Sequence, residues 1–287
     1  MKQPYDCLWD PAKEPTAPLS WCWRRRVRVL LDFADHAATD SAFAIMAMSP
    51  QLTFQVLAAD VEQIGAYLNK APGRIADRII ETRRATGDSC LVVPLPHIHP
   101  GAEWWPLPNV GIGATITDQA SADRIVPKLL QCPAAWRWLR CELRGAVDLR
   151  LYLLVTAELR RRGDQQTPNG WLGGIDWIEL AGGEDPLHPD WARQLRNQCQ
   201  AAGVPFWFTG WGDWARLGDL PISGAKFGPE RLLYSEIDKT FSRVGDRRRA
   251  DALPPMSDMM ARAGAHASDR LLDGRKHDGL PEIGGAR

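Results

Sequence analysis

Polar side chains that could do chemistry follow the expected strands of this chain, close to the points where those strands end. Because the carboxyl ends of parallel strands meet at one edge of a sheet, we expect these side chains to line a common mouth. Carboxylates gathered there could hold a divalent cation, bind a polar cofactor or supply acid and base groups. The residues expected to form this binding edge are Asp32, Asp35, His36, Glu142, Gly182, Gly183, Glu184 and Trp211.

Some acidic residues at the strand ends have a simpler explanation. Aspartate often caps the helix that follows a strand-to-helix turn, and this accounts for Asp60 and Asp118 without any chemistry. The surroundings of Asp35, Glu142 and Glu184 look less like simple caps. Glu184 also follows two glycines, which would let a ligand approach the backbone closely. The sequence has no Gly-x-Ser-x-Gly elbow and no His-Glu-x-x-His motif, and it predicts no metal site.

The stretch Gly174–Trp211 has the pattern of a strand, a turn, a helix and a second strand. Its first apolar run, Ile175–Leu180, has the length of a strand and is followed by two glycines. Pro189 and Asp190 then open a helix. Similar runs recur along the chain, and six strands are expected at Val27–Leu31, Leu52–Leu57, Asn109–Thr115, Trp136–Cys141, Ile175–Leu180 and Val204–Phe208.

Helical patterns stand between most of these strands, so right-handed crossovers would wind the strands into a parallel sheet. We therefore predict an α/β fold, a partial (β/α)6 TIM-barrel-like parallel sheet with an irregular C-terminal extension. The expected divisions are a flexible N-terminal arm at residues 1–22, the barrel domain at 23–214 and the extension at 215–287. An Asp-Gly turn within Arg270–Pro281 predicts a small hairpin that serves as a latch.

Two further helix predictions rest on local patterns. Asp40 precedes a run of apolar residues at helical spacing, so we expect it to cap the first helix. Glutamate precedes basic residues in Pro229–Phe241, which indicates a helical piece there.

The composition of the chain argues against some classes of function. Lys plus Arg and Asp plus Glu are both 35, so the formal net charge is zero and a nucleic-acid partner is not supported. No apolar run approaches the ~18 residues of a membrane span, and no signal peptide is recognisable. The six cysteines have no zinc-knuckle or redox spacing, which is typical of reduced thiols. The expected location is the cytoplasm.

Four segments carry a resemblance to a known family: Phe43–Leu57, Pro106–Gly113, Ile175–Gly212 and the tail Arg270–Pro281. In these segments the chain resembles the phage- and prophage-associated three-cysteine-motif family, whose genes often neighbour a three-Cys-motif partner protein. The family has no settled activity. The resemblance implies a radical-SAM-like partial barrel, a [4Fe-4S] cluster and S-adenosylmethionine as cofactors, and the partner protein as a binding partner.

The chain departs from this family at its defining motif. The family's N-terminal Cys-x6-Cys-x2-Cys loop, which would ligate the cluster, is absent, because Cys7 and Cys22 are too far apart and have no third partner. Charged residues of the family are also replaced within Leu57–Asp60 and Ala114–Thr117. The residues that remain of the expected site are Asp35, Glu142, Gly182, Gly183, Glu184 and Trp211.

These observations favour a divergent radical-SAM-like barrel that has lost its iron-sulfur loop and acts as a binding or interaction module. The partner expected for such a module is the three-Cys-motif partner protein. The alternative is an N-terminally truncated radical-SAM-like enzyme that acts on a nucleotide or a nucleic-acid-linked substrate. A third hypothesis is a metal-dependent hydrolase that uses the carboxylate-lined mouth together with His36.

Overall fold

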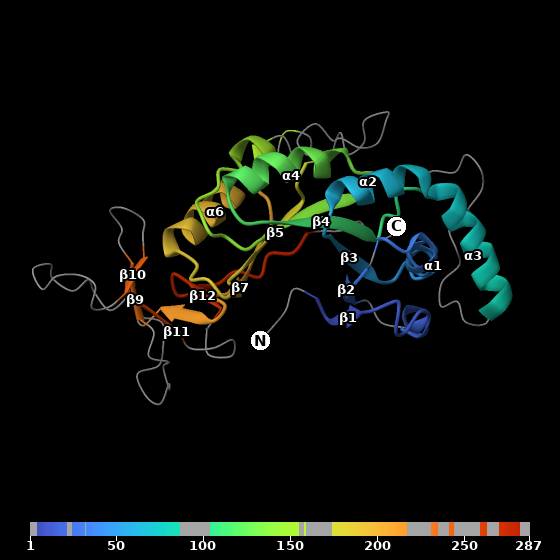
Figure 1. Cartoon of the computed structure of the whole chain (residues 1–287), viewed down its shortest axis with the longest axis horizontal. Coiled ribbons are helices and arrows are strands. Elements are labelled where there is room, and N and C mark those ends of the chain that lie inside the picture. Colours follow the sequence, from blue (N-terminus) through green and yellow to red (C-terminus); the bar gives the residue numbers. More distant parts are fainter. Residues whose placement is uncertain are drawn as a thin grey trace, which may run out of the picture.

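The largest element of the computed structural model is a sheet of seven parallel strands, arranged in the sheet in the same order as in the chain. The structure describes residues 5–21, 25–31, 33–86, 104–154, 158, 174–216, 231–234, 241–243, 259–262 and 270–281. The sheet is curled into a half-barrel with helices along it (Figure 1). This confirms the predicted α/β, partial TIM-barrel-like fold. The strands are β1 (Cys7–Trp9), β2 (Arg26–Val29), β3 (Thr53–Ala58), β4 (Val110–Ile116), β5 (Trp136–Cys141), β6 (Trp177–Ala181) and β7 (Phe206–Gly210).

The helices follow the strands of the half-barrel and cover one side of its sheet (Figure 1). The side chains of Asp60 and Asp118 accept hydrogen bonds from backbone N–H groups of the helices that follow them, as predicted for caps. Gly203 ends the last helix in the left-handed region, with φ at 64°. The helices are α1 (His36–Ala47), α2 (Val61–Lys70), α3 (Pro72–Thr86), α4 (Gln119–Gln131) and α6 (Pro189–Ala202), with a 3-10 turn at η1 (Ala17–Ser20).

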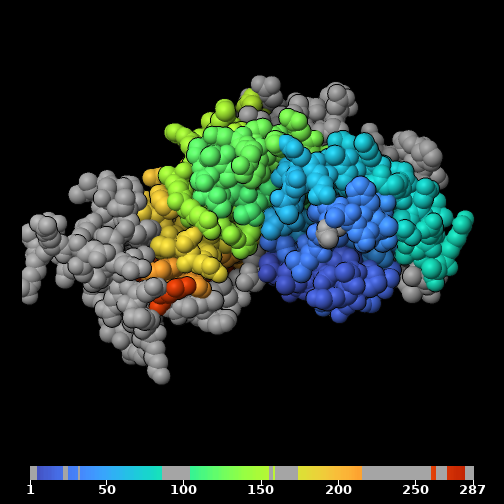
Figure 2. Space-filling view, viewed as in Figure 1, coloured from blue at the N-terminus to red at the C-terminus, as the bar shows by residue number. Residues whose placement is uncertain are grey.

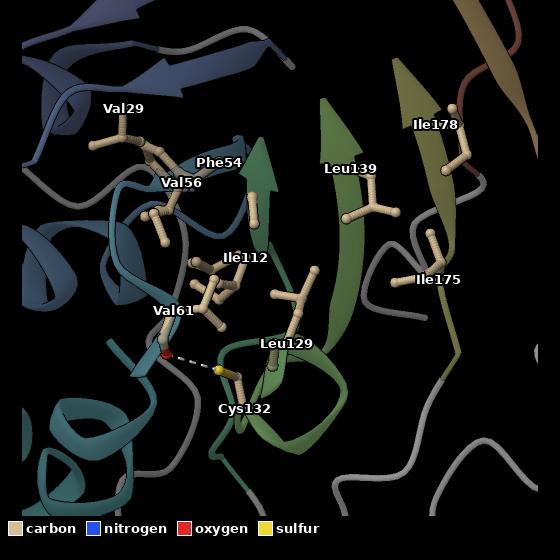
Figure 3. Packing of buried hydrophobic residues seen from close by; sticks show 14 of the residues in the cluster. Val29, Phe54, Val56, Val61, Ile112, Leu129, Cys132, Leu139, Ile175 and Ile178 are labelled. Carbon is tan, nitrogen blue, oxygen red and sulfur yellow. Dashed lines mark hydrogen bonds between the residues drawn. The ribbon is translucent and has the colours of Figure 1, made fainter. Parts of the chain in front are cut away.

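The side of the sheet that faces the helices forms the main hydrophobic core (Figure 3). Successive side chains of a strand point to opposite faces, so alternate residues of each strand contribute to this core. Residues of α2 and α4 complete it from the other side, with Val61 and Leu129 among them. The strand residues that pack here, all at most 2% exposed, include Val29, Phe54, Val56, Ile112, Leu139 and Ile178.

The opposite face of the sheet carries a second, separate cluster, formed by Trp136, Trp138, Trp177 and Trp207. Two of these indole rings lie over the glycines of the neighbouring strand β4. A Cβ atom added to Gly111 would lie 2.3 Å from the ring of Trp136, and one added to Gly113 would lie 2.1 Å from the ring of Trp138. The glycines of β4 therefore make room for tryptophans on this face.

Short antiparallel segments follow the half-barrel. One sheet has the order β10-β9-β11-β8, and a hairpin joins β12 to β13. Asp273 and Gly274 form the turn of the hairpin with φ values of 53° and 73°, which confirms the predicted Asp-Gly turn. The strands are β8 (Trp214–Arg216), β9 (Arg231–Tyr234), β10 (Phe241–Arg243), β11 (Met259–Arg262), β12 (Leu271–Leu272) and β13 (Arg275–Lys276).

The residues after the hairpin lie along the edge of β7. The backbone N–H of Phe208 donates to the carbonyl of His277 at 2.9 Å, and that of Gly279 donates to the carbonyl of Phe206 at 2.9 Å. The indole Nε1 of Trp177 donates to the carbonyl of Gly279, also at 2.9 Å. We refer to Leu271–Lys276 as the latch hairpin, and it leads directly into the segment that covers this edge of the sheet.

Three local predictions differ from the structure. Part of the expected N-terminal arm is regular, because Cys7–Trp9 pairs with β2 as the first strand of the sheet. The prediction of a helix at Pro229–Phe241 is wrong for residues 231–234, which form β9 and pair with β10 and β11. The partners of β9 are β10, seven residues further along the chain, and the more distant β11, and the local spacing of charges reveals neither.

The prediction that Asp40 caps the first helix is also wrong. The helix begins at His36, and the capping side chain is that of Asp35. Asp40 lies inside the helix instead, where its carboxylate accepts hydrogen bonds from the hydroxyl of Tyr67 at 2.6 Å and from Nε of Arg74 at 3.0 Å. These contacts join α1 to α2 and α3.

Replacement of Gly113 by alanine tests the packing of tryptophan against β4. We expect Gly113→Ala to lower the free energy of unfolding by about 1–3 kcal/mol, because the new methyl group overlaps the Trp138 ring. Gly73→Ala is the matched control, since Gly73 lies in α3 with no heavy atom within 4 Å of its added Cβ. Alanine there should stabilise the protein by about 0.5–1 kcal/mol. Urea unfolding of both variants measures the difference, and equal effects would contradict the packing.

Candidate functional site

An ion pair crosses the inside of the half-barrel. Nη2 of Arg28 on β2 donates to Oε2 of Glu179 on β6 at 2.6 Å. The three strands β3, β4 and β5 separate β2 from β6 in the sheet. In a flat sheet these two strands would lie about 19 Å apart, at about 4.8 Å per strand, too far for two side chains to meet. The contact therefore exists because the sheet curls with these side chains on its concave face.

Glu179 is fully buried, and both of its carboxylate oxygens are bound by arginine. Oε2 accepts from Arg28, and Oε1 accepts from Nη1 of Arg140 on β5 at 2.5 Å. Gln55 on β3 extends the network, because its Oε1 accepts from Nε and Nη2 of Arg28 at 3.1 and 3.0 Å. Every acceptor of the buried carboxylate thus has a charged donor, which is what a buried charge requires.

The network leads outward to the mouth of the half-barrel. Nε of Arg140 donates to Oε1 of Glu142 at 2.7 Å, directly after the end of β5. The exposed fraction of the side chain rises from 0% in Glu179 to 25% in Arg140 and 40% in Glu142. The predicted carboxyl edge is therefore connected, through Glu142, to a buried ion network whose other members lie outside that edge.

Aromatic rings and carboxylates act on the two arginines in different ways. The guanidinium of Arg28 lies between the rings of Trp138 and Tyr5, at 4.4 and 4.9 Å from their centroids. Burial lowers the pKa of the Arg28 guanidinium, while the carboxylate of Glu179 opposes this shift. Burial would also lower the pKa of Arg140, but the carboxylates of Glu179 and Glu142 outweigh it and raise that pKa. Arginine stays protonated in both settings.

Several residues expected at the binding edge have other roles. The carboxylate of Asp35 accepts from the backbone N–H of Ala38 at 3.0 Å, so it is the N-cap of α1. The interpretation that Asp35 is less like a cap than Asp60 is therefore wrong. His36 is the first residue of α1 and is exposed, with its ring 5.6 Å from that of Tyr67. Asp32 lies outside the described residues.

The glycine pair after β6 packs closely against the loop that follows β7. A Cβ atom on Gly182 would lie 2.1 Å from the carbonyl carbon of Trp211, so the backbone of this loop, not a ligand, occupies that space. Trp211 is 1% exposed, and its Nε1 donates to the carbonyl of Leu271 at 3.1 Å, which makes it part of the core. A Cβ atom on Gly183 would meet no heavy atom within 4 Å, although the Gly183 carbonyl accepts from the N–H of Asp213 at 3.1 Å, and Glu184 is exposed. Of Gly182, Gly183, Glu184 and Trp211, only Gly183 and Glu184 are exposed.

The sequence carried one signal that would have indicated the buried network. Arg28, Arg140 and Glu179 each stand alone between apolar neighbours inside an expected strand. A charged residue in such a position points to the face opposite the apolar core. In most strands that face meets solvent, so the pattern of each strand alone does not indicate that the three residues are partners.

The cysteines in the described residues do not fit an iron-sulfur cluster. Cys7 lies on β1, Cys132 after α4, Cys141 on β5 and Cys199 on α6, and no group of three potential metal ligands occurs among the described side chains. Burial raises the pKa of the Cys132 thiol to about 11 and that of the Cys199 thiol to about 12. A metal ligand must be a thiolate, which these environments oppose.

Comparison with known families places the chain in one of them. A family model described as "Protein of unknown function (DUF5131)" matches residues 14–281. The chain belongs to this family. The model covers the whole ion network from Arg28 to Glu179 and also the latch hairpin. No curated protein and no solved structure matches the chain. In the part of the chain that the structure describes, every helix is too short or too polar to cross a membrane.

A pair of variants tests the role assigned to Asp35. Asp35→Ala should lower the free energy of unfolding by about 1 kcal/mol, because α1 loses the acceptor for one of its first N–H groups. Glu184→Ala is the matched control at an exposed carboxylate of the same edge, and it should change stability by less than about 0.5 kcal/mol. Guanidinium unfolding of both variants gives the comparison. Equal stability of the two variants would contradict the cap.

Proposed function

We propose that the protein is a binding or interaction module whose binding edge is the mouth of the half-barrel. The observation that carries the proposal is the placement of Arg140, whose guanidinium is held between buried Glu179 and half-exposed Glu142. Two of the three guanidinium nitrogens are used in these bonds. Nη2 has no hydrogen bond to any described residue, and the side chain is 25% exposed. Arg140 therefore presents fixed N–H donors at the carboxyl edge of the sheet.

A donor held in this way suits the recognition of an acidic group. A guanidinium binds carboxylate or phosphate through its N–H groups, and less side-chain entropy is lost when the guanidinium is already fixed. Glu142 supplies an acceptor at this position. Exposed Glu184 follows the end of the neighbouring strand β6, and a Cβ atom on Gly183 would meet no heavy atom within 4 Å. The mouth thus offers both donors and acceptors to one polar ligand surface, which favours an acidic segment of a partner protein.

The partner that we propose is the three-Cys-motif partner protein implied by the resemblance. The phage association and the cytoplasmic location implied by the same resemblance belong to this proposal. The chemistry of the described residues does not favour the radical-SAM-like alternative, because the four described thiols lie on separate elements and burial raises the pKa of each. The hydrolase hypothesis loses support in the same way, since Asp35 is a helix cap and Glu142 is bound by Arg140.

Titration with the partner protein tests the proposed role of Arg140. We expect Arg140→Lys to weaken binding about ten-fold, equivalent to about 1.4 kcal/mol, because lysine keeps the charge but loses the donors at Nη2. Arg150→Lys is the matched control, since Arg150 is an exposed arginine that pairs with Asp148 and has no bond to the network of Glu179 among the described residues. Isothermal titration calorimetry gives the three affinities. A folded Arg140→Lys variant that binds as tightly as the wild type would contradict the proposal, as would a wild type that does not bind.

Anaerobic reconstitution with iron and sulfide distinguishes the module from the radical enzyme. Iron content and absorbance are measured on the full chain after removal of unbound iron. Little bound iron is expected. A content of roughly four irons per chain, that of one [4Fe-4S] cluster, would contradict the non-catalytic function.

A further inference from the structure

A cleft of about 750 Å³ lies beside the start of β7, between α6 and the latch hairpin. One wall is formed by Arg196 and Gln200 on α6, and the other by the hairpin and the residues that follow it. Its floor includes Val204 and Phe206, at the start of β7. Figure 2 shows the hairpin in red against the yellow surface of α6. The volume is that of a typical small-molecule site.

The carboxylates of this cleft are already bound by arginines. Oδ1 of Asp273 accepts from Nε of Arg193 at 2.9 Å, and its Oδ2 accepts from Nη1 of Arg196 at 2.6 Å. Asp278 is bound by Arg270. Although burial alone would raise the pKa of the Asp273 carboxyl, the hydrogen bonds from the two arginines outweigh it and lower that pKa. Both carboxylates therefore contribute little free negative charge.

Two cations of the cleft remain without an opposite charge. Arg275 and Lys276 on β13 are exposed and make no ion pair with the described part of the chain. They follow the Asp273-Gly274 turn, whose geometry is fixed by its pairing with α6. A chain with a formal net charge of zero thus places an excess of positive charge at the rim of one cleft. Such an excess attracts anions.

The inner wall of the cleft is closely packed. The rings of Phe206 and His277 meet edge to face with centroids 5.7 Å apart. Phe206 and Val204 belong to the main core and are 7% and 4% exposed, so they close the cleft on this side and offer little surface to a ligand. Burial lowers the pKa of the His277 imidazole, although a hydrogen bond with the backbone of Leu272 opposes this. The cationic rim is therefore the part of the cleft that would recognise a ligand, and its charge matches an anionic group.

We propose that this cleft binds a phosphorylated small molecule of nucleotide size. Arg275 and Lys276 would bind the phosphate, and the rest of the ligand would occupy the cleft between α6 and the hairpin. Because the hairpin walls the cleft and also fixes the segment along β7, the ligand would hold the latch closed against α6. The site is separate from the mouth at Arg140, since it lies where β7 begins and not where the strands end.

The test uses adenosine monophosphate as the probe and the full chain as the protein. Isothermal titration should give saturable binding with a Kd below about 1 mM, and adenosine should bind at least about ten-fold more weakly because it lacks the phosphate. The double variant Arg275→Ala/Lys276→Ala should weaken binding of the monophosphate at least about ten-fold. Arg83→Ala/Arg84→Ala is the matched control, because it removes two adjacent exposed cations from α3 and should bind like the wild type.

Amide NMR spectra of the wild-type chain locate the binding without any variant. Shifts are expected at Arg196, His277 and Gly279, and none at Arg140 or Gly183. The absence of saturable binding up to roughly 10 mM would overturn the proposal. So would an equal loss of affinity in the two double variants, shifts confined to the mouth, or equal binding of adenosine and its monophosphate.

Discussion

The ion pair between Arg28 and Glu179 is the contact that links the curl of the sheet to the binding edge. It joins strands that are separated by three others in the sheet, so it can form only when the sheet is curled. The tryptophans on the concave face fill the remaining space, and the glycines of β4 admit their rings. Arg140 reaches the mouth in a defined orientation because its other end is fixed by the same carboxylate. Fold and binding edge therefore share one interaction.

Burying such a network of charges costs free energy. Removing an arginine and a glutamate from water costs several kcal/mol for each ion, and only good geometry with further hydrogen bonds offsets that cost. Here Gln55 and Arg140 supply those bonds, and the rings of Tyr5 and Trp138 cover the guanidinium of Arg28. A buried pair can serve specificity more than stability. In this protein the pair specifies a curled sheet and the orientation of Arg140.

The sequence predicts the strands well because each expected run has a face that must be buried. Ile175–Leu180, for example, overlaps β6, and its residues Ile178 and Leu180 lie in the core. The sequence marks the helix caps less clearly. Asp35 and Asp40 both precede residues at helical spacing, and only the backbone conformation shows that Asp35 is the cap. The two glycines before Glu184 suggest that a ligand approaches the backbone. Gly182 is instead required because the backbone of the loop after β7 lies against it.

The partners within the site could not be predicted from local patterns. Arg28 and Glu179 are 151 residues apart in the chain, and each pattern alone indicates only a charged residue on one face of a strand. The pairing follows from the curl of the sheet, and the curl depends on packing across all the strands. The strand β9 shows the same limit, because Arg231–Tyr234 pairs with both β10 and the more distant β11, and its own charge pattern indicates neither partner.

A double-mutant cycle between Arg28 and Glu179 tests the central claim most directly. The variants Arg28→Met, Glu179→Leu and their combination are unfolded in urea, and the free energies of unfolding are compared. Glu179→Leu should lower the free energy of unfolding by about 3–5 kcal/mol, because it leaves the buried guanidinium of Arg28 without a carboxylate. Arg28→Met should lower it by less, because Glu179 keeps its bond to Arg140. The double variant should lose much less than the sum, with a coupling energy of at least about 2 kcal/mol. Additive losses within about 0.5 kcal/mol would show that the two side chains do not interact, and would contradict the account.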